Sequence, residues 1–201
     1  HLHDPELLLI GMNLKRLGKK VIFDSHEDVP SQMLDNTYLI YPIRWVLSKL
    51  IKYIERYACA KFDAIITATS FIRDKFLRIN PNSIDINNFP LINQSISTRN
   101  NYKPNSVCYA GAIGKKRGII EMVSALKYVH GGIRLSLAGN FYEEKIKNIV
   151  MKINEWDLVD FHGYIDSAEV NMMYGKSFAG LVLFHPAENH VNSQPNKLFE
   201  Y

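Results

Sequence analysis

The sequence carries two short clusters of histidine and acid that could do chemistry. The first, HLHD, opens the chain, and the second, HED, begins at residue 26. Imidazole nitrogens and carboxylate oxygens ligate metal ions, and a histidine also serves as an acid or base near neutral pH. A metal site would require five side chains to converge: His1, His3, Asp4, His26 and Asp28.

The residues around each cluster favour different roles. Pro5 follows Asp4 and opens the helix-like stretch PELLLIGMNLKRLG, which predicts Asp4 as the N-cap and Pro5 as the first helical residue. HED instead follows KKVIFDS, a short strand with a polar end. Ligands of open α/β sheets bind beyond the carboxyl ends of strands. We therefore expect HED to be the functional cluster, HLHD to be structural, and no metal site.

A third candidate is the stretch YAGAIGKKRGIIEMVSAL at 109–126. Its strand, glycine-bearing turn, basic residues and helix would present backbone amides and a helix dipole to a phosphate, with full charge from Lys116 or Arg117. The spacing fits neither the dinucleotide nor the Walker pattern. A solvated basic turn would have the same composition, so both interpretations stay open.

Strands and helices that alternate along the chain must position these residues. Such alternation predicts parallel sheets wound by right-handed crossovers. The predicted strands are 19–25, 63–69, 106–114, 133–139, 159–165 and 179–186, and the predicted helices are 5–18, 42–62, 70–79, 119–129, 143–153, 167–177 and 195–201. Ser70 is the expected N-cap of its helix.

One region interrupts the alternation. From residue 80 to 104 the sequence is rich in Asn, Ser and Pro and has no helical period, and its later part is predicted to be a linker. The fold class is therefore α/β, with two Rossmann-like lobes and helices on both faces of their sheets. We expect lobes at 1–92 and 106–201 and an interlobe linker at 93–105.

The amino-acid composition and net charge narrow the classes of ligand that the protein could bind. The 201 residues are 47% hydrophobic with a net charge of +4, which favours anionic ligands such as nucleotides or lipid phosphates and does not indicate nucleic acid. Cys59 and Cys108 lack motif spacing and are predicted to be core residues in a reducing compartment. With no signal-like or membrane-spanning segment, a cytoplasmic protein is expected. The terminal residues suggest an internal piece of a longer chain.

The helix predicted near residues 42–62 has a pattern that could bind a membrane surface. A basic side opposes its apolar stripe, so the helix could lie on anionic lipid at the inner face of a membrane. Packing against the chain's own sheet gives the same pattern, and we favour that interpretation. The stripe comprises Ile43, Leu47, Leu50, Ile54 and Tyr57, and the basic side comprises Arg44, Lys49, Lys52 and Arg56.

Six segments, in order and at similar spacing, resemble the retaining glycosyltransferases of family four, the group 1 enzymes with the GT-B fold. They are HLHDPELL, FDSHEDVP, YAGAIGKKRG, LAGNF, FHGYI and SQPNKLFEY. The resemblance implies an internal fragment of a hexosyltransferase that needs no cofactor or metal. It also implies a UDP- or GDP-linked sugar donor and a glycan or lipid-linked acceptor.

The resemblance also implies roles for individual residues. His26 resembles the family's active-site histidine, and an imidazolium there would stabilise the leaving diphosphate. In the donor lobe the family has an Arg just after the first strand's glycine. Here that place is Ala112, so this basic contact is either lost or supplied by Lys115 or Lys116. Arg117 resembles the family's second cation. Gly111 and Gly139 follow strands at the donor side.

The family's pair of glutamates, eight positions apart, is only half present. Glu200 resembles the second, which binds ribose hydroxyls, whereas the first place is Asn192. An amide can orient a sugar but carries no charge, so Asn192 is either adapted to its substrate or weakens catalysis. The neighbouring donor-side residues implied are Ser193, Asn196 and Lys197. A GT-B nucleotide-sugar epimerase and a non-catalytic nucleotide-binding module remain alternatives.

Overall fold

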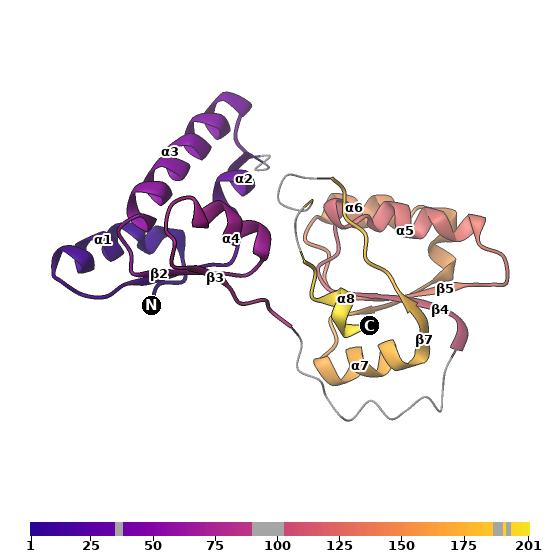
Figure 1. Ribbon diagram of the computed structural model, residues 1–201. Helices are drawn as coiled ribbons and strands as arrows, with labels where there is room; N and C mark the ends of the chain where they lie inside the picture. The colour runs from indigo at the N-terminus through magenta and orange to yellow at the C-terminus, as the bar shows by residue number, and fades with distance from the viewer. Residues whose placement is uncertain (35–37, 90–102, 187–190, 192–193) are drawn as a thin grey trace. The chain divides into compact units, whose positions relative to one another are not determined.

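The computed structural model describes residues 1–34, 38–89, 103–186, 191 and 194–201 (Figure 1). The chain divides into two compact units, which we describe separately. The first comprises His1–Phe89 with Pro186–Gln194, and the second comprises Pro90–His185 with Pro195–Tyr201.

The first unit contains a three-stranded parallel sheet of order β1-β2-β3. Its core cluster includes Phe23, Ile65 and Phe76, each at most 2% exposed. The elements are the 3₁₀ helix η1 (Pro5–Leu7), α1 (Leu8–Arg16), β1 (Ile22–Ser25), α2 (Val29–Leu34), α3 (Tyr41–Cys59), β2 (Ala64–Thr67), α4 (Ser70–Leu77) and β3 (Ser83–Asp85).

Of the two expected helix caps, Asp4 is confirmed in position and Ser70 is wrong. Asp4 does stand at the N-cap of η1 with Pro5 in the first turn, but its side chain accepts no capping hydrogen bond. The N-cap of α4 is Thr69 and not Ser70, because the Thr69 side chain accepts a hydrogen bond from the Ile72 amide at 3.3 Å. The extended backbone at Thr69 places its hydroxyl next to the Ile72 amide, which has no hydrogen-bond partner within the helix.

The long helix α3 packs with only part of the apolar stripe that its periodicity predicts, because Ile54 contacts the core cluster but most of the stripe does not. Ile43, Leu50 and Tyr57 of that stripe are exposed. The buried positions include Ser48 and Glu55, and Ser48 donates a hydrogen bond to the Pro30 carbonyl. Polar contacts to α2 and α4 therefore help to orient this helix together with the buried Ala58 and Cys59, and a count of hydrophobic positions cannot anticipate the polar part.

The second unit contains a four-stranded parallel sheet of order β6-β5-β4-β7. Figure 1 shows α5 and α6 on one face of this sheet and α7 on the other, so it is covered on both sides. The elements are β4 (Lys103–Ala110), η3 (Lys115–Arg117), α5 (Ile119–Ala125), η4 (Leu126–Tyr128), β5 (Arg134–Ala138), α6 (Glu144–Val150), η5 (Asn154–Leu158), β6 (Val159–Gly163), α7 (Ser167–Lys176), β7 (Ser177–Gly180) and α8 (Lys197–Glu200).

Most predicted elements lie where the sequence placed them, with four differences. The sequence did not predict α2 or the short strand β3, and β4 begins at Lys103, inside the expected linker. The last strand, β7, ends at Gly180 although the apolar run continues beyond it. Among the described residues, no helix is both long and apolar enough to cross a membrane.

Candidate functional site

The best-defined candidate site lies at the carboxyl edge of the second unit's sheet, where a glycine directly follows each of β4 and β5. Gly111 donates its amide to the Ala138 carbonyl at 3.0 Å, and Gly139 donates to the Gly163 carbonyl at 2.7 Å. Both Gly111 and Gly139 have φ +132, a conformation that side-chain-bearing residues rarely adopt. The two turns are therefore built for glycine.

Close backbone contact is a second reason for glycine at this edge. A Cβ on Gly139 would collide with the carbonyl oxygen of Gly111, which is backbone and cannot move aside. A Cβ on Gly111 would lie 2.5 Å from the Lys197 ammonium. The absence of side chains thus leaves space beside a cation here, an arrangement that suits an anionic ligand.

The loop after Gly111 is fixed to the neighbouring strand. Ile113 is fully buried and its amide donates to the Asn140 carbonyl at 3.0 Å. Gly118, at φ +69, ends the 3₁₀ turn that carries the basic residues and precedes α5. Arg117, in that turn, lies with its guanidinium 4.5 Å from the centre of the Phe184 ring. The loop therefore holds a cation close to the glycine edge.

Lys197 is the most perturbed cation of this edge. Its ammonium lies 3.9 Å from the centre of the Tyr109 ring, and burial followed by repulsion from Arg117 lowers the pKa of Lys197 to about 8. Burial also raises the pKa of Tyr109 to about 12, so that phenol stays neutral, and its hydroxyl donates to the Ala112 carbonyl. An anion bound between the two cations would favour the protonated lysine.

Aromatic contacts hold α8 and Glu200 in this unit. Tyr174 donates its hydroxyl to the Glu200 carboxylate at 3.3 Å, and its ring meets the Tyr201 ring edge to face. Burial and nearby groups, Glu200 among them, raise the pKa of Tyr174, so it remains a donor. Tyr201 in turn packs where Gly180 has no side chain. Glu200 itself is exposed and can meet a ligand.

The structure brings together most of the donor-side residues implied by the sequence, all within one unit. Lys116 lies in the same turn as Arg117 and its carbonyl accepts the His185 amide at 3.0 Å. Asn196 begins α8. Asn192 and Ser193 lie outside the described residues.

Sequence reasoning missed the aromatic residues that support this edge. Tyr109, Tyr174 and Tyr201 position Lys197 and Glu200, yet their apolar rings look like ordinary core residues in the sequence. The position of Tyr109 just before the glycine turn is a signal in the sequence that could have indicated its role.

The first unit places His26 directly after β1, as predicted. Its Nε2 lies 3.4 Å from His3 Nδ1 and 3.8 Å from Asp24 Oδ1. The His3 and His26 rings stack with an interplanar angle of 17°. HLHD therefore meets the HED region in space.

Of the two acids in the metal set that the sequence analysis weighed, Asp28 is paired elsewhere. Asp28 lies 2.9 Å from Lys75, which holds the pKa of Asp28 below its usual range although burial opposes this. Lys75 also pairs with the buried Glu55 at 2.6 Å. Asp4 lies at the start of η1. The acid that approaches the histidines is Asp24, which sequence reasoning did not consider.

Comparison with known proteins identifies the fold. No protein-family model and no curated protein matches the sequence. TarM from S. aureus, solved with fondaparinux, alpha-GlcNAc-glycerol and UDP, is similar over 94% of this chain and 37% of its own, with 15% identity and a TM-score of 0.65. The lipopolysaccharide outer core galactosyltransferase WaaB matches 94% of this chain and 50% of its own, at 13% identity and a TM-score of 0.58.

A plant enzyme shows the same likeness. The catalytic domain of starch synthase IV from Arabidopsis thaliana, bound to ADP and acarbose, covers 98% of this chain and 53% of its own, at 10% identity and a TM-score of 0.58. The chain therefore has the two-lobed α/β fold of GT-B glycosyltransferases. It spans about half the length of these proteins or less.

Proposed function

We propose that this chain is part of a glycosyltransferase that uses a nucleotide-sugar donor. The observation that carries the proposal is the glycine edge of the second unit, where Gly111 and Gly139 expose main chain beside Lys197 and Arg117. TarM and starch synthase IV, which share the fold, were solved with UDP and ADP respectively. A diphosphate fits this combination of bare backbone and fixed cations.

Each donor-side residue has a part in this proposal. Lys197 and Arg117, with Lys116 in the same turn, neutralise charge that develops on the leaving diphosphate, so transfer needs no added metal or cofactor. Asn196 and Ser193 supply backbone amides to the phosphates. Glu200 accepts hydrogen bonds from the ribose hydroxyls.

The proposal extends to the chemistry at the sugar. His26 hydrogen-bonds a sugar hydroxyl or the departing phosphate, and Asn192 orients the sugar from the position at which the resembling family has an acid. Transfer of a hexose from UDP or GDP, with retention at the anomeric carbon, to a glycan or lipid-linked acceptor follows from that resemblance.

Calorimetric titration with UDP, GDP and inorganic phosphate tests the donor site. We expect one nucleoside diphosphate to bind more tightly than phosphate, and Lys197→Met to weaken that binding at least about tenfold through loss of a charge-assisted contact. Lys145→Met, which changes an exposed lysine on α6, is the matched control and leaves affinity unchanged. Equal affinity in both variants contradicts the proposed diphosphate site.

Product analysis separates the proposed transferase from its alternatives. Incubation with nucleotide sugars and a glycan acceptor should give a glycosylated product with the donor's anomeric configuration. An epimerised sugar without acceptor modification would indicate the epimerase, and nucleotide binding without turnover would indicate a binding module.

We further propose that α3 contacts an anionic membrane at the cytoplasmic face, consistent with a lipid-linked acceptor. Exposed aromatic, aliphatic and cationic side chains share its surface, and the Lys49 ammonium lies 5.5 Å from the centre of the Trp45 ring. The buried thiols of Cys59 and Cys108 fit a reducing compartment. Sedimentation with anionic vesicles should decrease in Lys49→Glu, whereas neutral vesicles should bind neither form.

A further inference from the structure

The chain topology places potential metal ligands on one side of the first unit's sheet edge. Leu2 forms a parallel bridge with Phe23 of β1, flanked by two backbone hydrogen bonds of 2.9 and 2.8 Å. Both side chains are buried. Because side chains alternate along extended backbone, the neighbours of these two residues emerge on the opposite side. Those neighbours are His1, His3 and Asp24.

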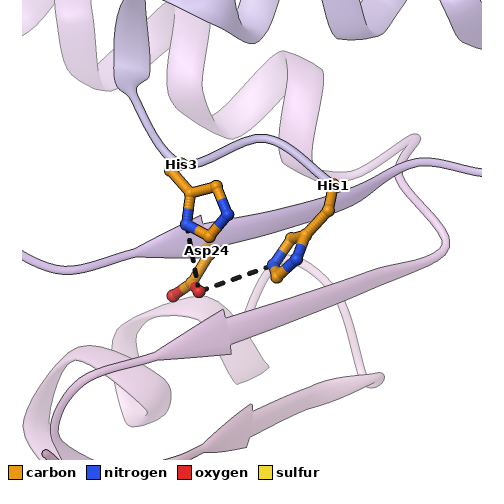
Figure 2. Close-up of side chains that lie close together, drawn as sticks. All are labelled: His1, His3 and Asp24. Carbon is orange, nitrogen blue, oxygen red and sulfur yellow. Dashed lines mark ion pairs between the residues drawn. The ribbon is translucent and has the colours of Figure 1, made fainter.

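The donor atoms of these neighbours converge. Asp24 Oδ2 lies 3.4 Å from His1 Nε2 and 3.5 Å from His3 Nδ1 (Figure 2). One ligand atom from each of the three residues lies within 4.8 Å of the others. His26, two positions after Asp24, brings its Nε2 to 3.4 Å from His3 Nδ1 and 3.8 Å from Asp24 Oδ1. His1, His3 and Asp24 therefore form a compact group of donors, and His26 adjoins this group beside His3 and Asp24.

The spacing matches a tetrahedral transition-metal site. With metal–ligand bonds of about 2.0–2.1 Å, ligand atoms in a tetrahedron lie about 3.4 Å apart. Four of the six separations among these residues lie between 3.4 and 3.8 Å, close to that value, and metal binding would draw His26 toward His1 to complete the set.

Charge and access also suit a metal ion. Three neutral imidazoles and one carboxylate give the group a single negative charge, which attracts a dication. The Asp24 side chain is only 15% exposed, whereas the three imidazoles are between 44% and 58% exposed. The carboxylate is thus held in place by the sheet, and an ion can reach the open side from solvent.

We propose that His1, His3, Asp24 and His26 bind a divalent transition-metal ion, with Zn²⁺ the best fit to three nitrogens and one oxygen. Mg²⁺ and Ca²⁺ prefer oxygen ligands and are excluded by this donor set. Metal binding does not rest on the proposed transferase function. If that function holds, the metal occupies the His26 imidazole, so the metal-bound protein is inactive in transfer.

Calorimetric titration with Zn²⁺, Co²⁺ and Mg²⁺ tests the site. For this titration the protein is expressed with a histidine-free N-terminal extension, so that the α-amino group of His1 cannot act as a ligand. We expect a single equivalent of Zn²⁺ to bind, Co²⁺ to give the visible absorption of a four-coordinate site, and Mg²⁺ to give no heat. Asp24→Asn and His3→Ala should each weaken Zn²⁺ binding at least about tenfold.

Two further variants keep the test decisive. His1→Ala removes a half-exposed ligand at the edge of the unit without disturbing the core, so its loss of affinity cannot be attributed to unfolding. His162→Ala changes an exposed histidine on β6 and should leave Zn²⁺ affinity unchanged. Absence of Zn²⁺ binding, equal affinity in His1→Ala and His162→Ala, or equal binding of Mg²⁺ would overturn the proposal.

Discussion

The carboxyl edges of the two sheets differ in the groups that they present, which are backbone groups in one unit and side chains in the other. In the second unit the edge is main chain, with Gly111 and Gly139 in a conformation reserved for glycine. In the first unit side chains occupy the edge. Asp24 lies beside the histidines, and Lys75 of α4 pairs with neighbouring acids. We call the edge at Gly111 and Gly139 the backbone edge and the edge at Asp24 and Lys75 the side-chain edge. Backbone groups do not titrate, whereas the side chains of the second edge can bind protons and metal ions. The same sheet geometry therefore supports two kinds of ligand.

The largest expected effect concerns the backbone edge. Gly139→Ala combines an unfavourable φ, costing about 1–3 kcal/mol, with a collision against Gly111, costing about 1–3 kcal/mol more. We expect a total loss of about 4 kcal/mol in the free energy of unfolding, measured by urea denaturation. Gly131→Ala is the control, since Gly131 also has positive φ but no atom lies within 4 Å of its added Cβ. Equal losses in the two variants would show that the backbone contact is unimportant.

The side-chain edge should depend almost as strongly on one lysine. Lys75→Met leaves the buried Glu55 and the neighbouring Asp28 without their cation, and breaking a buried pair in this way costs about 3 kcal/mol. Arg73→Met, which removes a more exposed cation of α4, should cost less than about 1 kcal/mol. Thermal and urea unfolding of the two variants measure the difference, and equal losses would contradict a special role for Lys75.

Lys197 is a pH-sensitive group of the backbone edge. Because its pKa is lowered from 10.5 to about 8, affinity for inorganic phosphate should fall as pH rises through about 8. In the free protein the sign for stability is opposite. Between about pH 8 and 10.5 the unfolded chain keeps a proton that the folded chain has released, so this group makes folding more favourable as pH rises.

Calorimetry at pH 7 and pH 9 measures the phosphate effect. Lys197→Arg keeps its charge at both values, and its phosphate affinity should change little between them. A fall of similar size in wild type and Lys197→Arg would show that another group is responsible.

The smallest effect concerns local structure near the side-chain edge. Thr69→Ala removes the N-cap of α4, the helix that carries Lys75, and should cost about 1 kcal/mol. Ser70→Ala changes the residue that the sequence favoured as the cap and should cost less. Urea denaturation of both variants decides which residue caps the helix.

The sequence by itself determined the α/β class, the order of most helices and strands, and the glycine turn at 109–126. These features are local, because period, β-branching and turn chemistry act over a few residues. His26 could also be placed at the end of a strand from local pattern alone. Short or polar elements escaped detection: β3 has three residues, and its pairing with β2 supplies what its own sequence lacks.

Only the tertiary structure decided which side chains meet. Asp24 joins His1 and His3 because Leu2 pairs with Phe23, a contact between residues far apart in the sequence. The face that α3 buries includes Glu55, paired with Lys75, beside the core residues Ala58 and Cys59. Such contacts depend on chain topology and on desolvation of specific groups, and neither quantity can be read from the spacing of residues along one segment.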